Sequence, residues 1–223
     1  MGTWIVTGAS RGIGLETCRQ LAQRGDRVFA ACRTSSPELD ALGVEVVPGI
    51  DITGEDCAML VGQALRRAGI DRVDVLVNNA GVLVPDALDT LDFETLRREY
   101  DVNALGALRM TKGLLPMLGK GSKVALVSSR VGSLGDNSSG GLYGYRMSKA
   151  ALNMAGVSMA LDLAPRGVMV VILHPGYIRT QMTGGAGNDP PPVAAKGLIA
   201  RIDELTPAKS GSFLHANGEE LPW

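Results

Sequence analysis

The chain has few of the residues that build metal centres and disulfide frameworks, and no long apolar run. Only three of its 223 residues are cysteines and two are histidines, and no two cysteines form a CxxC pair. An odd, scattered set of cysteines argues against a disulfide framework or a zinc site and indicates reduced thiols. The longest apolar runs, such as VMVVIL, have the length of a strand, so no membrane-spanning helix is expected. We therefore expect a cytoplasmic protein without a bound metal.

The chain also lacks an excess of either charge. Its 22 basic and 23 acidic residues give a formal net charge of −1. Proteins that bind nucleic acid or anionic membranes through bulk electrostatics need a basic excess. The N-terminus enters an apolar strand pattern at once, without the basic and apolar regions of a signal peptide. We expect no nucleic-acid partner and no membrane partner.

Short apolar runs rich in strand-forming residues alternate with amphipathic segments of helix length. The runs are TWIVTG, RVFAACR, VEVVPGID, VDVLVNNAG, KVALVSS, VMVVILHPG and the weaker GSFLH, and the helical segments include 14–24, 55–68, 93–118 and 145–164. Strands that are apolar along their whole length indicate a parallel sheet covered on both faces. The sequence predicts an α/β fold: one doubly wound (Rossmann) domain over residues 1–223, with about seven strands.

The segment 180–193, TQMTGGAGNDPPPV, interrupts this alternation. Its glycines and prolines predict little regular structure, and it follows the end of a strand, where ligands bind in such sheets. It is either a surface loop or a mobile lid over a ligand.

A glycine-rich turn, TGASRGIG, follows the first strand and opens the first helix. Its glycines are Gly8, Gly12 and Gly14. Glycines at such a turn let a pyrophosphate approach the backbone and aim a helix N-terminus at the anion. The context predicts a dinucleotide site.

The second strand ends in AACRTSS and offers no acidic residue for an adenosine ribose. NAD-binding units usually place a carboxylate there. Arg33 and Arg11 instead supply planar donors suited to a 2′-phosphate. We therefore predict NADP(H) in preference to NAD(H). Asp51, after the third strand, is a candidate for the adenine edge, for a helix N-terminal cap region, or for both.

The stretch GLYGYRMSKAALN contains a tyrosine and a lysine four residues apart. Residues at this spacing share one face of a helix, so Tyr145 and Lys149 are expected to be neighbours, whereas Tyr143 precedes the settled helix. An ammonium about 4 Å from a phenolate contributes on the order of 4 kcal/mol, enough to bring the pKa of a tyrosine from ~10 towards neutrality. Such a phenol can donate a proton to a carbonyl oxygen or accept one in reverse.

These motifs together resemble the short-chain dehydrogenase/reductase family over essentially the whole chain. They are TGASRGIG, NNAG, the asparagine of YDVNALGAL, SSRVG, the Tyr145-x-x-x-Lys149 pair and HPGYIRT, in that order. The loop SLGDNSSGG and the ending GSFLHANGEELPW resemble the branch that contains the bacterial C-factor and the sniffer-type carbonyl reductases.

The resemblance implies a role for each matching residue. Tyr145 would be the general acid/base, Lys149 would hold the nicotinamide ribose and lower the pKa of the tyrosine, and Asn103 would hold a water in a proton relay. Ser129 would bond the substrate carbonyl, with Ser133 as the alternative. Asn78 is expected on the adenosine side. The expected cofactor-binding residues are Gly8, Ser10, Arg11, Gly12, Ile13, Gly14, Arg33, Asp51, Ile52, Asn79, Ala80, Gly81, Tyr145, Lys149, Pro175, Gly176, Ile178 and Thr180.

Two functions remain open at this point. One is an NADPH-dependent reductase of a ketone, aldehyde or quinone, and the other is a C-factor-like signalling protein that binds NADP(H) and has secondary redox activity. Two helices, in the runs NALGALRMTKGLLPML and ALNMAGVSMALDLA, are apolar nearly all round and need a second cover besides the sheet. Because family members often pair these helices, the resemblance implies a homodimer or homotetramer.

Overall fold

A seven-stranded parallel sheet forms the centre of the computed structural model, which describes residues 1–223. The strand order is β3-β2-β1-β4-β5-β6-β7, and neighbouring strands are parallel throughout. The strands are β1 (Thr3–Thr7), β2 (Arg27–Ala31), β3 (Glu45–Val47), β4 (Val75–Asn78), β5 (Lys123–Val127), β6 (Met169–His174) and β7 (Phe213–His215). The order reverses between β1 and β4, which is where doubly wound sheets bind ligands. The predicted fold class is confirmed.

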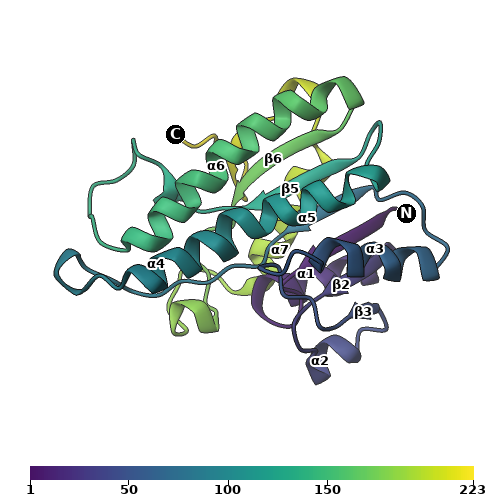
Figure 1. The fold of residues 1–223 in the computed structure, drawn as a ribbon, viewed down its shortest axis with the longest axis horizontal. Helices are drawn as coiled ribbons and strands as arrows, with labels where there is room; N and C mark the ends of the chain where they lie inside the picture. The colour runs from purple at the N-terminus through teal and green to yellow at the C-terminus, as the bar shows by residue number, and fades with distance from the viewer.

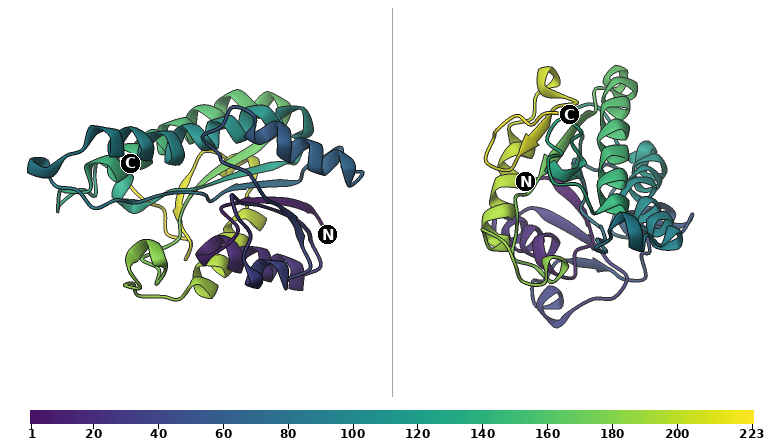
Figure 2. Two further views of the ribbon diagram at one scale, coloured as in Figure 1. Left: turned by 60° about the horizontal axis from the view of Figure 1, so that its bottom comes forward. Right: turned by 90° about the vertical axis from the view of Figure 1, so that its left-hand side faces the viewer.

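Helices cover both faces of this sheet (Figures 1 and 2). They are α1 (Gly12–Gln23), α2 (Pro37–Asp40), α3 (Cys57–Arg67), α4 (Phe93–Tyr100), α5 (Gly106–Leu114), α6 (Tyr143–Leu163) and α7 (Pro191–Asp203). Side chains of α3, α5 and α6 share one buried cluster, and those of α1 and α7 share the other. None of the helices combines the length and apolarity that a bilayer crossing requires.

Alternate side chains of each central strand belong to the two buried clusters on opposite faces of the sheet. In β5, Val124 and Leu126 join the cluster under α5 and α6, whereas Ala125 and Val127 join the cluster under α1 and α7. Because successive side chains point to opposite faces, a strand apolar at every position is required where both faces are covered. This is why the strand runs of the sequence show no polar alternation.

The helix boundaries differ from the sequence expectations at two places. The predicted helix 93–118 is divided into α4, a π-helical segment Asp101–Leu105, α5 and a 3₁₀ turn, Leu115–Met117. Helix α6 starts two residues earlier than predicted, so the expectation that Tyr143 precedes the helix is wrong. The carboxylate of Asp86 accepts the backbone N–H of Tyr143 at 2.5 Å and that of Gly144 at 3.0 Å, which satisfies the first turn.

The segment 180–193 has more regular structure than its composition predicts. It contains a 3₁₀ turn, Gln181–Thr183, in which the hydroxyl of Thr183 accepts the N–H of Thr180 at 3.1 Å and donates to Ile178 O at 2.9 Å. Its prolines begin α7, because proline fits the first helical position, where its missing N–H leaves no bond unmade. The expectation of little regular structure is therefore corrected.

The C-terminal residues turn back along the outer edge of β7. The N–H of His215 donates to Glu219 O at 2.8 Å, and that of Leu221 donates to Phe213 O at 2.9 Å. The ring of Trp223 stacks on Phe213 with ring centroids 5.5 Å apart.

Gly156 is the position at which α6 packs most closely on the sheet. A Cβ there would lie 2.5 Å from Cγ1 of Ile172 and 2.9 Å from Cδ1 of Leu126. Gly156→Ala is expected to lower the free energy of unfolding by about 1–3 kcal/mol, although alanine is the better helix former, because the fully buried side chains of Ile172 and Leu126 would have to shift. Urea denaturation measures this. Gly119→Ala, which meets no atom within 4 Å, is the control and should stay within about 0.5 kcal/mol; equal effects of both variants would refute the packing argument.

Candidate active site

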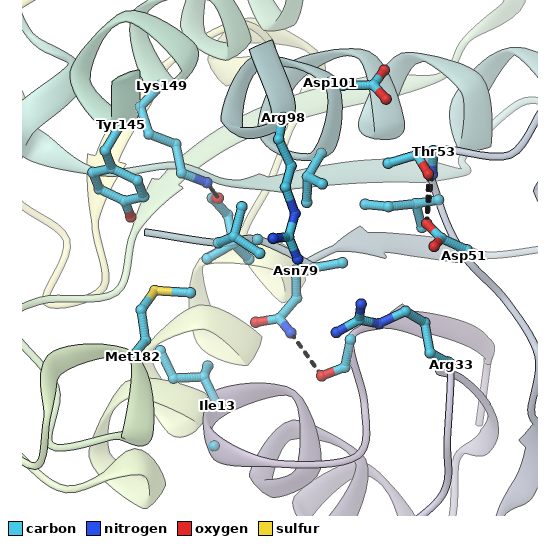
Figure 3. Close-up of a pocket in the computed structure, with 18 of the residues that line it drawn as sticks. Ile13, Arg33, Asp51, Thr53, Asn79, Arg98, Asp101, Tyr145, Lys149 and Met182 are labelled. Atoms are coloured by element: carbon cyan, nitrogen blue, oxygen red, sulfur yellow. Dashed lines mark hydrogen bonds between the residues drawn. The ribbon is translucent and has the colours of Figure 1, made fainter. Parts of the chain in front are cut away.

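A cavity of about 1570 Å³ opens at the carboxyl ends of the strands. It is bounded by the glycine-rich turn, the ends of β2, β4 and β5, helix α4, the start of α6 and the segment after β6. Arg33 and Asp51 lie at one end, and Tyr145 and Met182 at the other (Figure 3). Its position is the one at which doubly wound sheets bind their ligands.

The glycine-rich turn brings backbone against backbone. Gly8 has a φ of +65°, and a Cβ on it would lie 2.8 Å from the Cα of Ala80. A Cβ on Gly14 would collide with Gly8 O. Helix α1 therefore begins beside the sheet, and its first turn has neither a side-chain cap nor an acidic residue. Its free N–H groups suit an anion such as the pyrophosphate of a dinucleotide.

Asn79 holds this turn in place. Its Nδ2 donates to Thr7 O at 2.9 Å, and its own N–H donates to the hydroxyl of Thr7 at 3.0 Å. Asn78 points the other way: it is buried and donates to the hydroxyl of Thr111 on α5 at 3.2 Å. The expectation that Asn78 lies on the adenosine side is therefore wrong, because adjacent residues of a strand point to opposite faces.

The basic residues at the adenosine end differ in their contacts. The side chain of Arg33 extends into the cavity, and its guanidinium makes no hydrogen bond or ion pair to the protein (Figure 3). Arg11 also borders the cavity, but its Nη1 donates to Oε1 of Gln181 at 2.9 Å, which ties the glycine-rich turn to the segment 180–193. Arg33 thus has a free guanidinium in a position suited to a phosphate, and Arg11 would have to exchange a partner.

Asp51 forms a local turn at the rim of the cavity. Its Oδ1 accepts the N–H of Thr53 at 3.0 Å and the hydroxyl of the same residue at 2.8 Å. These bonds lower the pKa of Asp51, and the nearby Arg33 and Arg98 lower it further. Asp51 is not the N-cap of α3, which is Asp56, and its place in the cavity lining leaves the adenine edge as the prediction for it.

Tyr145 and Lys149 lie together on the first turns of α6, as their spacing predicts. The Nζ of Lys149 is 5.6 Å from the ring centroid of Tyr145, and both side chains are buried at the wall of the cavity. The ammonium donates to Val127 O at 2.9 Å (Figure 3). The helix thus brings the phenol and the amine to one wall.

The predicted lowering of the tyrosine's pKa is wrong for the protein alone. Burial raises the pKa of Tyr145 to about 12, although the hydroxyl of Ser129 lowers it, and the carboxyl of Glu99 raises it further. Burial also lowers the pKa of Lys149 to about 8. The argument from the sequence counted only the attraction between the ammonium and the phenolate. It left out the loss of water around both groups, which favours the neutral phenol and the neutral amine.

Of the candidate serines, Ser129 is the one beside the phenol. It lies close enough to Tyr145 to lower the pKa of the phenol. Ser133 is buried and accepts the N–H of Asp136 at 3.1 Å within its own turn. Ser128 donates to Oδ1 of Asn153 at 2.6 Å and so fastens β5 to α6.

Asn103 is hydrogen-bonded within the protein through both ends of its amide. Its Oδ1 accepts the N–H of Val82 at 2.8 Å, and its Nδ2 donates to Val82 O at 2.8 Å and to the hydroxyl of Ser148 at 2.9 Å. It lies in the π-helical segment, where the regular α-helical bonding pattern is interrupted. Its Oδ1 accepts a single hydrogen bond and keeps a second lone pair to which a water could donate, so the predicted role of Asn103 in holding a water stays a prediction.

Most of the expected cofactor-binding residues line the cavity, and a few lie behind it. Those lining it are Gly8, Ser10, Arg11, Gly12, Ile13, Arg33, Asp51, Ile52, Asn79, Ala80, Gly81, Tyr145, Lys149, Pro175 and Thr180. Asn103, Ser129, Gly14, Gly176 and Ile178 stand outside this lining. Gly14 allows the close packing of the turn, and Ile178 is buried beside the segment 180–193, so both support the wall.

Sequence reasoning missed the contribution of α4. Phe93, Arg97 and Arg98 line the cavity, and Arg98 extends into it from above (Figure 3). Met182 does so from the 3₁₀ turn after β6. Arg97 and Arg98 are consecutive, so neither could be assigned from the sequence to the inner or the outer face of an exposed helix.

The fold and this cavity define a class of protein: a doubly wound α/β protein with a site for a dinucleotide at the carboxyl edge of its sheet. The family model of the short chain dehydrogenases matches residues 3–190. The chain belongs to this family.

Relatives and solved structures agree with this assignment. The chain is 43% identical over 227 residues to 1-hydroxy-2-glutathionyl-2-methyl-3-butene dehydrogenase of Rhodococcus sp. (strain AD45), and the match covers 100% of both chains. It is 49% identical over 154 residues to C-signal of Myxococcus xanthus, covering 68% of this chain and 93% of that protein.

Two carbonyl reductases have closely similar structures. The NADPH-bound carbonyl reductase from chicken fatty liver has a TM-score of 0.91 at 26% identity, covering 100% of this chain and 99% of the other. The carbonyl reductase Sniffer of D. melanogaster has a TM-score of 0.92 at 27% identity, covering 100% of both chains. The predicted resemblance to the C-factor and sniffer-type branch is confirmed.

Proposed function

We propose that the protein is an NADPH-dependent reductase that converts a carbonyl compound, a ketone, aldehyde or quinone, into its alcohol. The observation that carries the proposal is the buried Tyr145–Lys149 pair at one end of a cavity whose other end presents the free guanidinium of Arg33. A phenol and a phosphate-binding group at opposite ends of one cavity suit a reaction in which a dinucleotide and a carbonyl meet.

The chain's own residues would handle the proton. When bound, the nicotinamide supplies a hydride to the carbonyl carbon and is oxidised. As the π electrons of the carbonyl move to its oxygen, the phenol of Tyr145 gives that oxygen its proton, and the alcohol results. Lys149 would hold the ribose, Ser129 would orient the carbonyl oxygen, and a water held at Asn103 would relay the replacement proton from solvent.

The start of α1, which borders the cavity, is the part of the protein that would bind the pyrophosphate of the cofactor. The uncapped helix terminus suits a pyrophosphate, and Gly8 and Gly12 border the cavity without a side chain of their own. The NADPH bound to the chicken reductase supports NADP(H) as the cofactor here. The absence of a carboxylate at the end of β2 supports it further, because the position holds Cys32 and Arg33.

Arg33→Ala is expected to weaken NADPH binding about 10–100-fold and to change NADH binding less than threefold, because hydrogen bonds to a charged group contribute about 1.5–3 kcal/mol. Fluorescence titration of the purified protein with each cofactor measures this. The Arg11→Ala, Arg33→Ala double variant should lose further affinity for NADPH. Arg67→Ala, an exposed arginine at the end of α3, is the control. Equal affinity of the parent for both cofactors would refute the preference.

A second function is supported by the match to C-signal of Myxococcus xanthus. In that case the chain would be a nucleotide-bound signalling protein, and its redox chemistry would be secondary. The intact Tyr145–Lys149 pair favours the enzyme, because a sensor needs nucleotide binding but no proton donor. The Rhodococcus relative is named a dehydrogenase of a glutathionyl alcohol, so oxidised glutathione conjugates belong in the first panel of carbonyl substrates.

We further propose that the chain forms a homodimer or homotetramer through α6. Met147, Met154 and Leu161 follow one another at seven-residue intervals and are 59%, 68% and 71% exposed. Residues at this interval share one face of a helix, so they form an apolar stripe that a second copy would cover. Sedimentation of the purified protein tests this.

A further inference from the structure

Glu99 is a fully buried acid in a helix whose neighbouring side chains are exposed. Its exposed fraction is 0%, whereas Arg98 and Tyr100 on either side are exposed. Its Oε1 accepts the N–H of Val84 at 2.8 Å. Its Oε2 is buried and has no hydrogen-bond partner, and Glu99 forms no ion pair. Burying a carboxylate in this way is unfavourable, so its presence calls for a function.

Hydrogen bonding alone does not require the charge. Glu99 and Asn103, four residues apart on one helical face, together hold the extended segment that follows β4: Asn103 bonds Val82 and Glu99 bonds Val84. Asn103 does this with a neutral amide. A glutamine at position 99 would accept the N–H of Val84 equally well.

The unpartnered oxygen faces the start of α6. A Cβ on Gly144 would collide with Oε2 of Glu99, so the carboxyl lies directly against the residue before Tyr145. Only a glycine lets the acid approach this closely.

Two titratable groups face Glu99 from the elements packed against it. Burial raises the pKa of Glu99 most, the bond from Val84 lowers it, and the first of the two groups, Asp86 in the loop after β4, raises it further. The other group is Tyr145 of α6, whose pKa the carboxyl of Glu99 raises. Once Glu99 is ionised, its negative charge opposes the formation of a second negative charge on the phenol.

We propose that Glu99 is a positioning residue that acts through Tyr145: its buried charge adds to the effect of burial in keeping the phenol in the protonated form that carbonyl reduction needs. This inference rests on the proposed function and deepens it. The charge extends reduction to higher pH, and it raises the pH that the reverse oxidation, which starts from the phenolate, requires. It thus adapts the site to reduction.

The test is the pH dependence of kcat in both directions for Glu99→Gln. The basic limb of carbonyl reduction and the acidic limb of alcohol oxidation should both move to lower pH, by on the order of one pH unit. At low pH, where Glu99 of the parent is itself neutral, the two profiles should converge. Asp89→Asn removes an exposed charge from the loop between β4 and α4, is the matched control, and should leave both limbs in place.

A second variant separates the charge from the hydrogen bond. Glu99→Met removes both, so the proposal expects the same displacement of the limbs in the Met and Gln variants. If the limbs of the Gln variant coincide with those of the parent, the proposal is overturned. It is also overturned if the Met variant alone loses rate, and does so at every pH, because Glu99 then serves only as an acceptor for Val84.

A measurement without substrate distinguishes this proposal from the proposed function. If the parent reduces no carbonyl compound, the proposed function fails, and tyrosinate absorbance near pH 11 decides the role of Glu99. The Gln variant should then show more tyrosinate than the parent, and the excess should vanish when Tyr145→Phe is added. An excess that persists, or none at all, overturns the proposal.

Discussion

Tyr145→Phe is expected to lower kcat for carbonyl reduction about a thousandfold while NADPH affinity changes less than threefold. The substitution removes only the phenolic oxygen, and proton transfer by a positioned side chain typically contributes 10²–10⁴-fold. The ring stays in its buried place at the wall of the cavity, so the fold and the cofactor site should persist. Steady-state kinetics and a fluorescence titration measure the two quantities on one preparation.

Tyr143→Phe is the matched control, because Tyr143 belongs to the same helix turn and lies outside the cavity lining. Its rate should remain within about threefold of the parent. The reverse pattern, an inactive Tyr143 variant and an active Tyr145 variant, would transfer the acid/base role. If Tyr145→Phe abolished turnover but left a biological signal intact, the C-signal-like function would be favoured.

Lys149→Met is expected to stabilise the protein without cofactor at pH 7 while abolishing measurable turnover. Burial lowers the pKa of Lys149 from 10.5 to about 8, so holding it charged at neutral pH costs about 3 kcal/mol, at ~1.4 kcal/mol for each factor of ten in proton affinity. Loss of its bond to Val127 O offsets about 1 kcal/mol of that. The net gain in the free energy of unfolding should be about 2 kcal/mol in urea denaturation.

The sign of the pH dependence gives an independent check. The unfolded state binds more protons than the folded state between pH 8 and 10.5, so the parent should become more stable as pH rises through this window. The Met variant should lack that rise, and its advantage should disappear near pH 10. Lys209→Met, at an exposed position, should show neither effect. A Met variant less stable than the parent at pH 7 would contradict the argument.

The parts that the sequence predicted are those governed by local periodicity. Strand runs without polar alternation required a sheet covered on both faces, and the i, i+4 spacing placed Tyr145 beside Lys149. The glycine-rich sequence between a strand and a helix likewise predicted a tight turn, and Gly8 adopts the positive φ that such a turn requires.

The parts that it missed depend on distant residues. Burial decides the pKa of Tyr145, and the lysine does not. The extent to which water is excluded from the phenol depends on the packing of the whole chain, which a local sequence pattern does not predict. The partner of Arg11 is 170 residues away in the chain. Glu99 belongs to the run RREYD, which is typical of a solvated helix face, and only the packing of α4 on α6 shows that it is buried.

The returning C-terminal residues have a consequence for the behaviour of the chain in concentrated solution. An edge strand ordinarily offers a row of unpaired N–H and C=O groups that recruit strands of other molecules and seed aggregates. Here the outward groups of Phe213 and His215 are already bonded to Leu221 and Glu219, and the opposite edge strand, β3, has only 3 residues. Removing the residues after His215 would leave the outward groups of β7 unpaired and remove the ring that stacks on Phe213, so a truncated chain should aggregate more readily than the full chain under the same conditions.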